Sequence, residues 1–370
     1  MDKIECIYIT RTSLPSNNAR SVHVMKICEQ LNNLYGQKFV ALVGNKYEST
    51  EVICSKYGTS HFEIKELGIK CQNKKSFYVF ASHAAKFVRK YNIKKVITRD
   101  PLTALYISLM GIDVVLDLHA DMGWECGRAY HIFKAKKIVN KKNLHFSAIT
   151  YSLKDYYISN YNELYEKMIV IPDGVTLECY EGVSCVIPLK NDIIKIGYVG
   201  KFTSGKGIDT IIKIAKAMPK YRFYMYGGTK DDAENETGLT VSDNIVFGGY
   251  INNSKVPEIM KEMDIMMLPN KEKQICNKVP MGEFTSPIKM FEYMASGRPI
   301  IASDIPVLRE VLNEQNCYFA NEDDISSWIE CIEYINNNRD EALVKSRRAK
   351  KDVEQYTWKK RAEKLVELIR

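Results

Sequence analysis

The sequence reads TSPIKMFEYMASGRP from residue 285 to residue 299 and continues with IIASDIP from residue 300 to residue 306. The first part has the form of a short helix with both ends marked. Thr285 or Ser286 can cap the helix, and Pro287 suits its first position. Gly297 suits the left-handed residue after the last turn, and Pro299 prevents continuation. We therefore expect a helix of about ten residues, followed by a strand, as in doubly wound α/β proteins.

Both halves of the chain repeat this alternation of strand and helix. Strand-like apolar runs lie at 4–9, 39–43, 95–98 and 114–118 in the first half, and at 194–199, 222–226, 245–247 and 265–268 in the second. Such alternation predicts a mostly parallel sheet in each half. At 370 residues and 45% hydrophobic content, two cores are favoured over one. The expected fold class is α/β, with two Rossmann-like doubly wound parallel-sheet domains facing a central cleft.

Positive charge is concentrated in the first half. The whole chain has a net charge of +8, but residues 1–170 hold 25 basic against 15 acidic side chains, which leaves 28 against 30 for the remainder. Lysine clusters at 86–95 and 134–142 lie on segments with helical apolar spacing. This basic face suits anionic lipid or an acidic glycan, and an ordinary solvated surface is the alternative. Nucleic acid is disfavoured because no recognised binding module accompanies the charge.

The ten cysteines indicate reduced thiols. No C-x-x-C pair occurs, so neither a zinc cluster nor a redox motif is predicted. The first strand is too short for a signal peptide, and no apolar run approaches the roughly 18 residues of a membrane span. We expect a cytoplasmic protein, with the basic surface favouring peripheral contact with the inner face of the cell membrane.

A glycine-rich loop follows the strand at 194–199. Residues 200–207 read GKFTSGKG, which satisfies the first seven positions of a P-loop but has Gly207 where a nucleoside triphosphatase needs a hydroxyl for magnesium. What remains is a strand-to-helix turn whose N–H groups and two lysines, Lys201 and Lys206, suit a diphosphate. Surface lysines on an ordinary turn are the alternative.

The start of the helix near Ser286 offers a second anion-binding feature. Its first N–H groups and positive dipole end favour a phosphate, and Glu292, about two turns in, can accept hydrogen bonds from sugar hydroxyls. Asn270 follows the strand at 265–268 and is expected to face the same ligand. The combination suggests a nucleotide-sugar pocket, whereas a helix that serves packing alone is the alternative.

In the first half, His119 ends the strand at 114–118, where doubly wound sheets bind their ligands. Arg99 ends the preceding strand, and His23 lies in the first turn of the first helix, close to Arg20. Trp124 follows in a loop after His119. The alternative interpretation is that His119 is a core residue whose hydrogen bonds are made within the fold.

The stretch 285–306 resembles the donor-site signature of family-4 glycosyltransferases, which retain anomeric configuration and have the GT-B fold. The commonest signature has two glutamates eight positions apart. Glu292 matches the second, and Phe284 stands at the first, as in the Ser-Pro-x-Lys-x-Phe-Glu-Tyr variant of the family. Lys201 and Lys206 match the basic pair of these enzymes. The resemblance covers nearly all of the second half and is weaker in the first.

The resemblance implies a role for each candidate residue. The residues expected to act in catalysis are Lys201, Lys206, Glu292 and His119. Those expected to bind the donor are Gly200, Thr285, Ser286, Pro287, Ile288, Lys289 and Asn270. Those expected on the acceptor side are His23, Arg20, Arg99 and Trp124. The implied domains are 1–175 for the acceptor, 176–192 as linker, 193–350 for the nucleotide-sugar, and 351–370 as a C-terminal helix that crosses back to the first domain.

The function implied is that of a retaining, hexosyl-type glycosyltransferase. It would move a sugar from a UDP- or GDP-linked donor to a glycan or lipid-linked acceptor, in bacterial cell-surface polysaccharide synthesis. No metal and no cofactor is implied, and no D-x-D motif in strand context is found. Two alternatives stay open: a nucleotide-sugar 2-epimerase of the same fold, and a non-catalytic glycan-binding partner that has lost activity.

Overall fold

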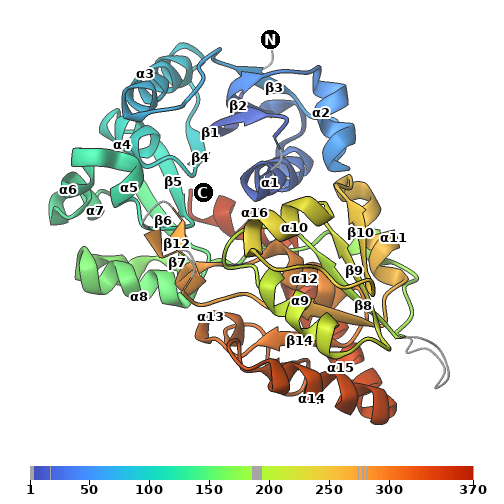
Figure 1. Ribbon diagram of the computed structural model, residues 1–370. Helices are drawn as coiled ribbons and strands as arrows, with labels where there is room; N and C mark the ends of the chain where they lie inside the picture. Colours follow the sequence, from blue (N-terminus) through green and yellow to red (C-terminus); the bar gives the residue numbers. More distant parts are fainter. Residues whose placement is uncertain are drawn as a thin grey trace. The chain divides into compact units, whose positions relative to one another are not determined.

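The computed structural model describes residues 4–16, 18–185, 194–273, 275–276, 279–280 and 282–369. The chain forms two compact units (Figure 1). Unit 1 comprises Met1–Asp173 and Trp358–Arg370, and unit 2 comprises Gly174–Thr357. The chain therefore returns to unit 1 at Trp358, seven residues after the expected start of the C-terminal helix at 351. Residues 186–192 of the expected linker lie outside the described part.

Unit 1 contains a seven-stranded parallel sheet in the order β3-β2-β1-β4-β5-β6-β7. Its strands are β1 (Cys6–Leu14), β2 (Phe39–Lys46), β3 (Ile64–Glu66), β4 (Lys95–Thr98), β5 (Asp113–Leu118), β6 (Leu144–Ala148) and β7 (Ile169–Val170). Its α-helices are α1 (Ala19–Tyr35), α2 (Thr50–Tyr57), α3 (Lys74–Lys90), α4 (Pro101–Leu109), α5 (Gly123–Cys126), α6 (Tyr130–Phe133), α7 (Lys136–Val139), α8 (Tyr151–Asn160) and α16 (Trp358–Glu367).

Unit 2 contains a six-stranded parallel sheet in the order β10-β9-β8-β11-β14-β15. Its strands are β8 (Lys195–Val199), β9 (Arg222–Tyr226), β10 (Ile245–Gly249), β11 (Ile265–Leu268), β14 (Ile300–Ser303) and β15 (Tyr318–Ala320), besides a hairpin of β12 (Ile275–Cys276) and β13 (Val279–Pro280). Its α-helices are α9 (Ile208–Ala217), α10 (Lys230–Thr237), α11 (Val256–Lys261), α12 (Ile288–Ala295), α13 (Pro306–Arg309), α14 (Ile325–Asn337) and α15 (Arg339–Asp352).

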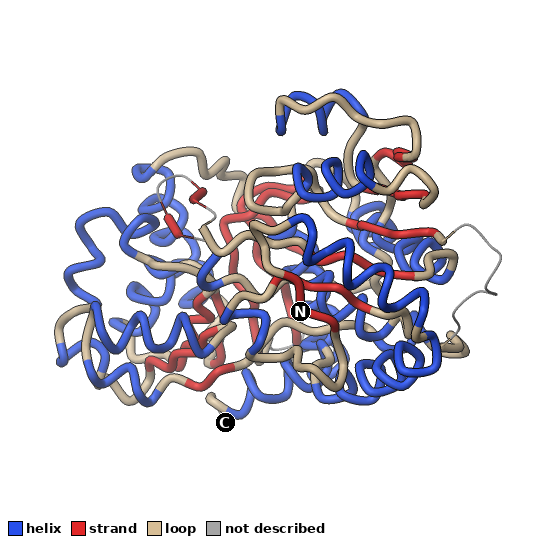
Figure 2. The backbone as a smooth tube through the Cα atoms, turned by 60° about the horizontal axis from the view of Figure 1, so that its bottom comes forward, coloured by secondary structure: helices blue, strands red, loops and turns tan. Residues whose placement is uncertain are grey.

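Helices flank the strands within each unit, so both sheets are buried on two faces (Figure 2). Short 3₁₀ helices also lie in the connections, at Gly36–Lys38, Gly127–Ala129, Glu163–Lys167, Leu177–Tyr180, Asn253–Lys255, Gly282–Phe284 and Val353–Gln355. The strands of a parallel sheet covered in this way are near-continuous apolar runs, which is why the sequence pattern reveals them. The prediction of two doubly wound parallel sheets is confirmed.

The C-terminal helix α16 completes the core of unit 1. Its buried residues Ala362, Leu365 and Val366 join the cluster that contains Val24 and Leu31 of α1. In Figure 1 the red α16 lies next to the blue α1. Because this apolar face is covered by α1, the last residues of the chain are part of the fold of unit 1 although they follow unit 2 in sequence.

The predicted boundaries of β1 and of the helix near residue 288 are wrong. The first strand does not end at residue 9: β1 continues to Leu14, because Arg11 is buried against Asp100, with Nε 3.0 Å from Oδ1. The helix at 288–295 is shorter than predicted. Pro287 is its N-cap, with an extended ψ of 121° and no side-chain cap, so the helix begins at Ile288. Gly297 has the predicted left-handed backbone, with φ of +67°.

Candidate active site

The glycine-rich loop after β8 is packed closely against its neighbours in unit 2. A Cβ at Gly207 would lie 1.9 Å from the carbonyl oxygen of Pro269, and the φ of Gly207 is +71°. A Cβ at Gly227 would lie 2.3 Å from the oxygen of Gly200. The N–H of Gly200 donates to Tyr226 O at 2.9 Å. This N–H is used within the fold, so Gly200 shapes the loop and does not offer a donor to a ligand.

Two tyrosines connect this loop to α12. The amide N–H of Val199 donates to Tyr293 Oη at 2.9 Å, which fixes the end of β8 to the helix. The hydroxyl of Tyr198 donates to the carbonyl of Lys201 at 3.3 Å and accepts from Lys289 Nζ at 3.3 Å. Neither tyrosine was predicted to have this role, since in the sequence both resemble ordinary core residues.

Three lysines lie on these two elements. Lys201 is exposed, whereas Lys206 is half-buried. The ammonium of Lys289 lies 4.3 Å from the centre of the Tyr198 ring. Burial lowers the pKa of Lys289 well below its usual value, and the charge of Lys206 lowers it further. No carboxylate is among the charges that act on Lys289 in the part of the chain that the structure describes.

The remaining donor-side candidates surround the start of α12 and the end of β11. Ser286 and Pro287 are buried, while Thr285, Ile288 and Glu292 are half-buried. Glu292 lies close enough to Tyr180 and Tyr293 to raise the pKa of both hydroxyls, although burial is the larger cause. Asn270 is only 4% exposed, and its Oδ1 has no hydrogen-bond partner among the described residues. A buried acceptor of this kind needs a partner.

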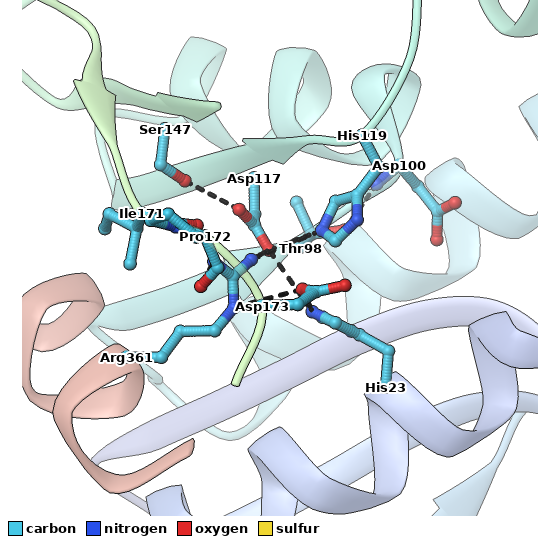
Figure 3. A network of polar contacts seen from close by, with 10 residues as sticks. All are labelled: His23, Thr98, Asp100, Asp117, His119, Ser147, Ile171, Pro172, Asp173 and Arg361. Atoms are coloured by element: carbon cyan, nitrogen blue, oxygen red, sulfur yellow. Dashed lines mark hydrogen bonds and ion pairs between the residues drawn. The ribbon is translucent and has the colours of Figure 1, made fainter. Parts of the chain in front are cut away.

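In unit 1, a buried polar network lies at the carboxyl ends of the strands (Figure 3). His119 Nε2 is 2.9 Å from Asp117 Oδ2, and Ser147 Oγ donates to Asp117 Oδ1 at 2.8 Å. Arg361 of α16 donates to Asp117 Oδ2 at 2.7 Å and lies 3.3 Å from His119 Nε2. Burial raises the pKa of Asp117, but Arg361 and His119 outweigh it and hold this pKa below the usual range.

His23 and Asp173 belong to the same network. His23 Nε2 lies 3.4 Å from Asp173 Oδ1, and its ring meets the edge of His119 at a centroid distance of 4.5 Å. Burial lowers the pKa of His23 well below its usual value, and burial with the charge of Arg99 lowers that of His119 to about 3. Burial raises the pKa of Asp173 to about 6. Both histidines are therefore neutral near pH 7.

Two of the predicted acceptor-side arginines approach this edge of the sheet in different ways. Arg20 donates from Nη2 to Asp100 Oδ1 at 2.9 Å, and Asp100 also binds Arg11. Arg99 has a buried Nε without a hydrogen-bond partner among the described residues. Burial lowers the pKa of Arg99, and the charge of Arg20 acts in the same direction. Trp124 lies in α5, and its side chain is outside the described part.

The acidic residue that contacts His119 is Asp117, which precedes it in the chain, and not Asp121, which follows it. Asp121 accepts hydrogen bonds from Gly123 N at 3.1 Å and from the hydroxyl of Tyr161. It therefore stabilises the turn into α5. The partner of His119 is Asp117, two residues earlier on the same face of β5, and the period of two along a strand is the signal that could have identified it.

A metal ion is a poor fit for this network. His23, Asp117 and His119 each offer one ligand atom, and these atoms lie within 4.8 Å of one another. The guanidinium of Arg361 already neutralises Asp117 at 2.7 Å, however, and Arg99 adds a second positive charge. The donor set is therefore better matched to arginine than to a divalent cation.

Comparisons with known proteins show which proteins the chain is similar to. Residues 194–338 match the family model described as glycosyl transferases group 1. An uncharacterized glycosyltransferase of Methanocaldococcus jannaschii is 25% identical over 288 residues, which cover 69% of this chain and 68% of that protein. The O-antigen chain mannosyltransferase RfbU of Salmonella typhimurium is 28% identical over 220 residues, and this match spans 55% of its length and 56% of this chain.

The fold is shared with solved glycosyltransferase structures. Anabaena HepE in complex with UDP and glucose aligns with a TM-score of 0.72 at 12% identity, over 98% of each chain. Fold and matches together define an enzyme of the glycosyltransferase class with two Rossmann-like domains. Residues 194–338 therefore resemble the group 1 glycosyl transferases, and the fold of the chain is GT-B.

Proposed function

We propose that this enzyme transfers a sugar from a nucleotide diphosphate-sugar to a glycan or lipid-linked acceptor, with retention of anomeric configuration. UDP or GDP would be the leaving group, and the product would enter a bacterial cell-surface polysaccharide. Two observations on other proteins support this choice: RfbU is named an O-antigen chain mannosyltransferase, and HepE was solved with UDP and glucose.

The observation that carries the proposal is the pair formed by Lys206 and Lys289. The two ammonium groups act on each other beside a glycine-rich loop, and the half-buried Lys289 donates to the Tyr198 hydroxyl at 3.3 Å. Two like charges held close together repel each other, and an anion bound between them would offset that repulsion. A diphosphate provides that anion, and its binding would raise the pKa of Lys289.

The mechanism proposed uses charge and position more than proton transfer by the protein. Lys206, Lys289 and the N–H groups at the start of α12 would stabilise the charge that develops on the diphosphate, a role worth about 3 kcal/mol per donor. The departing phosphate would take the proton of the acceptor hydroxyl. Because lysines supply the positive charge, we propose that neither a metal nor a cofactor is required.

Thermal unfolding in the presence of UDP, GDP, CMP and their sugars tests the donor site. A ligand that binds only the folded protein raises the midpoint by mass action, so one diphosphate should give a clear shift at millimolar concentration. Lys206→Ala should reduce that shift. Lys216→Ala is the matched control, because Lys216 is an exposed lysine on α9 and should leave the shift unchanged.

Product analysis then separates transfer from the alternatives. Incubation with the stabilising donor and a lipid-linked or glycan acceptor should give a new glycoside with the anomeric configuration of the donor. Conversion of the donor sugar without any acceptor would instead identify an epimerase. A protein that no diphosphate stabilises, with or without acceptor, would contradict the proposal and favour a binding partner without activity.

A further inference from the structure

Arg361 connects the last helix of the chain to the candidate catalytic histidine. Its side chain is 1% exposed and donates to the carbonyl groups of Ile171 and Pro172, the latter at 3.1 Å. The same guanidinium donates from Nη2 to Asp117 Oδ2 at 2.7 Å (Figure 3). Arg361 thus lies between the segment that leaves unit 1 and the end of β5.

Asp117 is held on both carboxylate oxygens. Oδ1 accepts from Ser147 Oγ at 2.8 Å, and Oδ2 accepts from Arg361 and lies 2.9 Å from His119 Nε2. A carboxylate fixed in this way can orient an imidazole ring and select its tautomer. His119 Nε2 then carries the hydrogen and donates to Asp117. Nδ1 becomes an acceptor, and it has no partner among the described residues.

Charged and titratable groups face His119 from each element packed around it. Asp117 comes from β5, Arg361 from α16, His23 from α1, and Arg99 from the end of β4. Asp173, from the segment after β7, lies next to His23 and Arg361 in the same network. Burial and the arginines favour neutral His119, whereas Asp117 favours the protonated ring. The removal of Arg361 alone would take away one of the charges that lower the pKa of His119, while Asp117 would still raise it. His119 would therefore take up a proton at higher pH.

We propose that Arg361 is a positioning residue for the transfer reaction: it fixes the Asp117 carboxylate and thereby keeps His119 in the tautomer that presents Nδ1 to a substrate hydroxyl. The proposal rests on the proposed function, since the hydroxyl is that of the sugar or acceptor. Arg361 itself touches no reacting atom. A purely structural role, the anchoring of α16 to Ile171 and Pro172, is the alternative that the test must separate.

Arg361→Gln is the main variant, and Leu365→Ala is its matched control. Leu365 is a buried apolar residue of the same helix that packs in the core, so its truncation weakens the anchoring of α16 without changing the charge near His119. Arg361→Gln should bind the donor nucleotide as the wild type does and lose about 10- to 100-fold in kcat, as misplacement of a catalytic group does. Leu365→Ala should lower Tm and leave the pH profile of kcat unchanged.

The pH profile is the deciding readout. In the wild type the acid limb due to His119 should lie near pH 3, and in Arg361→Gln it should move upward by at least about one pH unit, as the loss of a neighbouring charge does. His119→Asn in the Arg361→Gln background should abolish the displaced limb. A profile of Arg361→Gln that coincides with the wild type, or a loss that Leu365→Ala reproduces, would overturn the proposal.

Nitrogen NMR of the histidine rings tests the same point without activity. The wild type should show His119 as the Nε2–H tautomer, and Arg361→Gln should show a mixture or the protonated ring. This distinguishes failure of the inference from failure of the proposed function. If Arg361→Gln does not fold, Arg361→Lys replaces it in the test. The lysine retains the positive charge but loses the planar guanidinium, which binds several acceptors at once. A lysine variant with wild-type kcat and an unchanged tautomer would also overturn the proposal.

Discussion

At the scale of single residues, the buried histidines make stability depend on pH. His23 and His119 are neutral in the folded protein, because burial is the largest cause that lowers both pKa values from 6.5, that of His119 to about 3. Below pH 6.5 the unfolded chain takes up protons that the folded chain does not. His119 should therefore remove about 2 kcal/mol from the free energy of unfolding between pH 7 and pH 5, and His23 acts in the same direction. Urea unfolding across this range measures the loss in the free energy of unfolding. His23→Gln should make this loss smaller by the part that His23 contributes.

Asp173 acts in the opposite direction. Burial raises its pKa from 3.8 to about 6, although Arg361 and Arg99 lower it. The folded state holds this proton more strongly than the unfolded state, so the stability that it contributes at low pH is lost as the pH rises through 6. Asp173→Asn should consequently stabilise the protein at pH 8, by at most about 3 kcal/mol, and much less at pH 4. Equal effects at both pH values would contradict the raised pKa.

Arg361 and Asp117 were not predicted from the sequence, and the reasons are physical. Arg361 and Asp117 are separated by 244 positions in the chain, and only the return of α16 to unit 1 brings them together. His119 could be predicted because it follows an apolar strand in a fold that binds ligands at such ends. The partners of His119 could not be predicted, since a buried arginine on a helix has the same sequence pattern as a solvated one.

At the scale of elements, the turn at Gly207 gives a prediction about the donor loop. Gly207→Ala places a Cβ 1.9 Å from Pro269 O at a φ of +71°, so the loop must move. We expect a loss of at least about 2 kcal/mol in stability and a weaker nucleotide shift. Gly238→Ala is the control, because Gly238 has a φ of +68° with nothing within 4 Å of the added Cβ. It should cost about 1 kcal/mol and leave binding unchanged. Equal behaviour of the two variants would show that the contact with Pro269 is unimportant.

The elements themselves were largely predictable. The strands expected at 95–98, 222–226 and 265–268 coincide with β4, β9 and β11, because strands covered on both faces are near-continuous apolar runs. The extension of β1 through Arg11 was not predictable. Its polar residues pair with one another or with Asp100, as in the 3.0 Å contact between the hydroxyls of Thr10 and Thr12. Tertiary pairing of this kind leaves no apolar pattern in the sequence.

At the scale of the whole molecule, the uneven charge bears on where the enzyme works. Among the described residues, none of the helices combines the length and apolar character that a bilayer span requires. Unit 1 carries the excess of positive charge, since residues 1–170 hold 25 basic against 15 acidic side chains. On α3 the exposed face includes Lys75, Val79, Lys86 and Lys90, a mixture of basic and apolar groups at helical spacing. Such a face suits the headgroup region of an anionic membrane.

We therefore predict that the protein sediments with vesicles containing anionic lipid and that the bound fraction falls as salt is raised. Lys86→Glu combined with Lys90→Glu should weaken binding by about tenfold or more, since each lysine near the surface contributes about 1 kcal/mol. Lys216→Glu combined with Lys261→Glu, two exposed lysines of unit 2, makes the same change in net charge and should have a smaller effect. Equal losses from the two pairs would show that net charge alone attracts the protein. Binding that does not depend on salt would rule out the electrostatic explanation, and an acceptor held at the membrane would then need another means of reaching the enzyme.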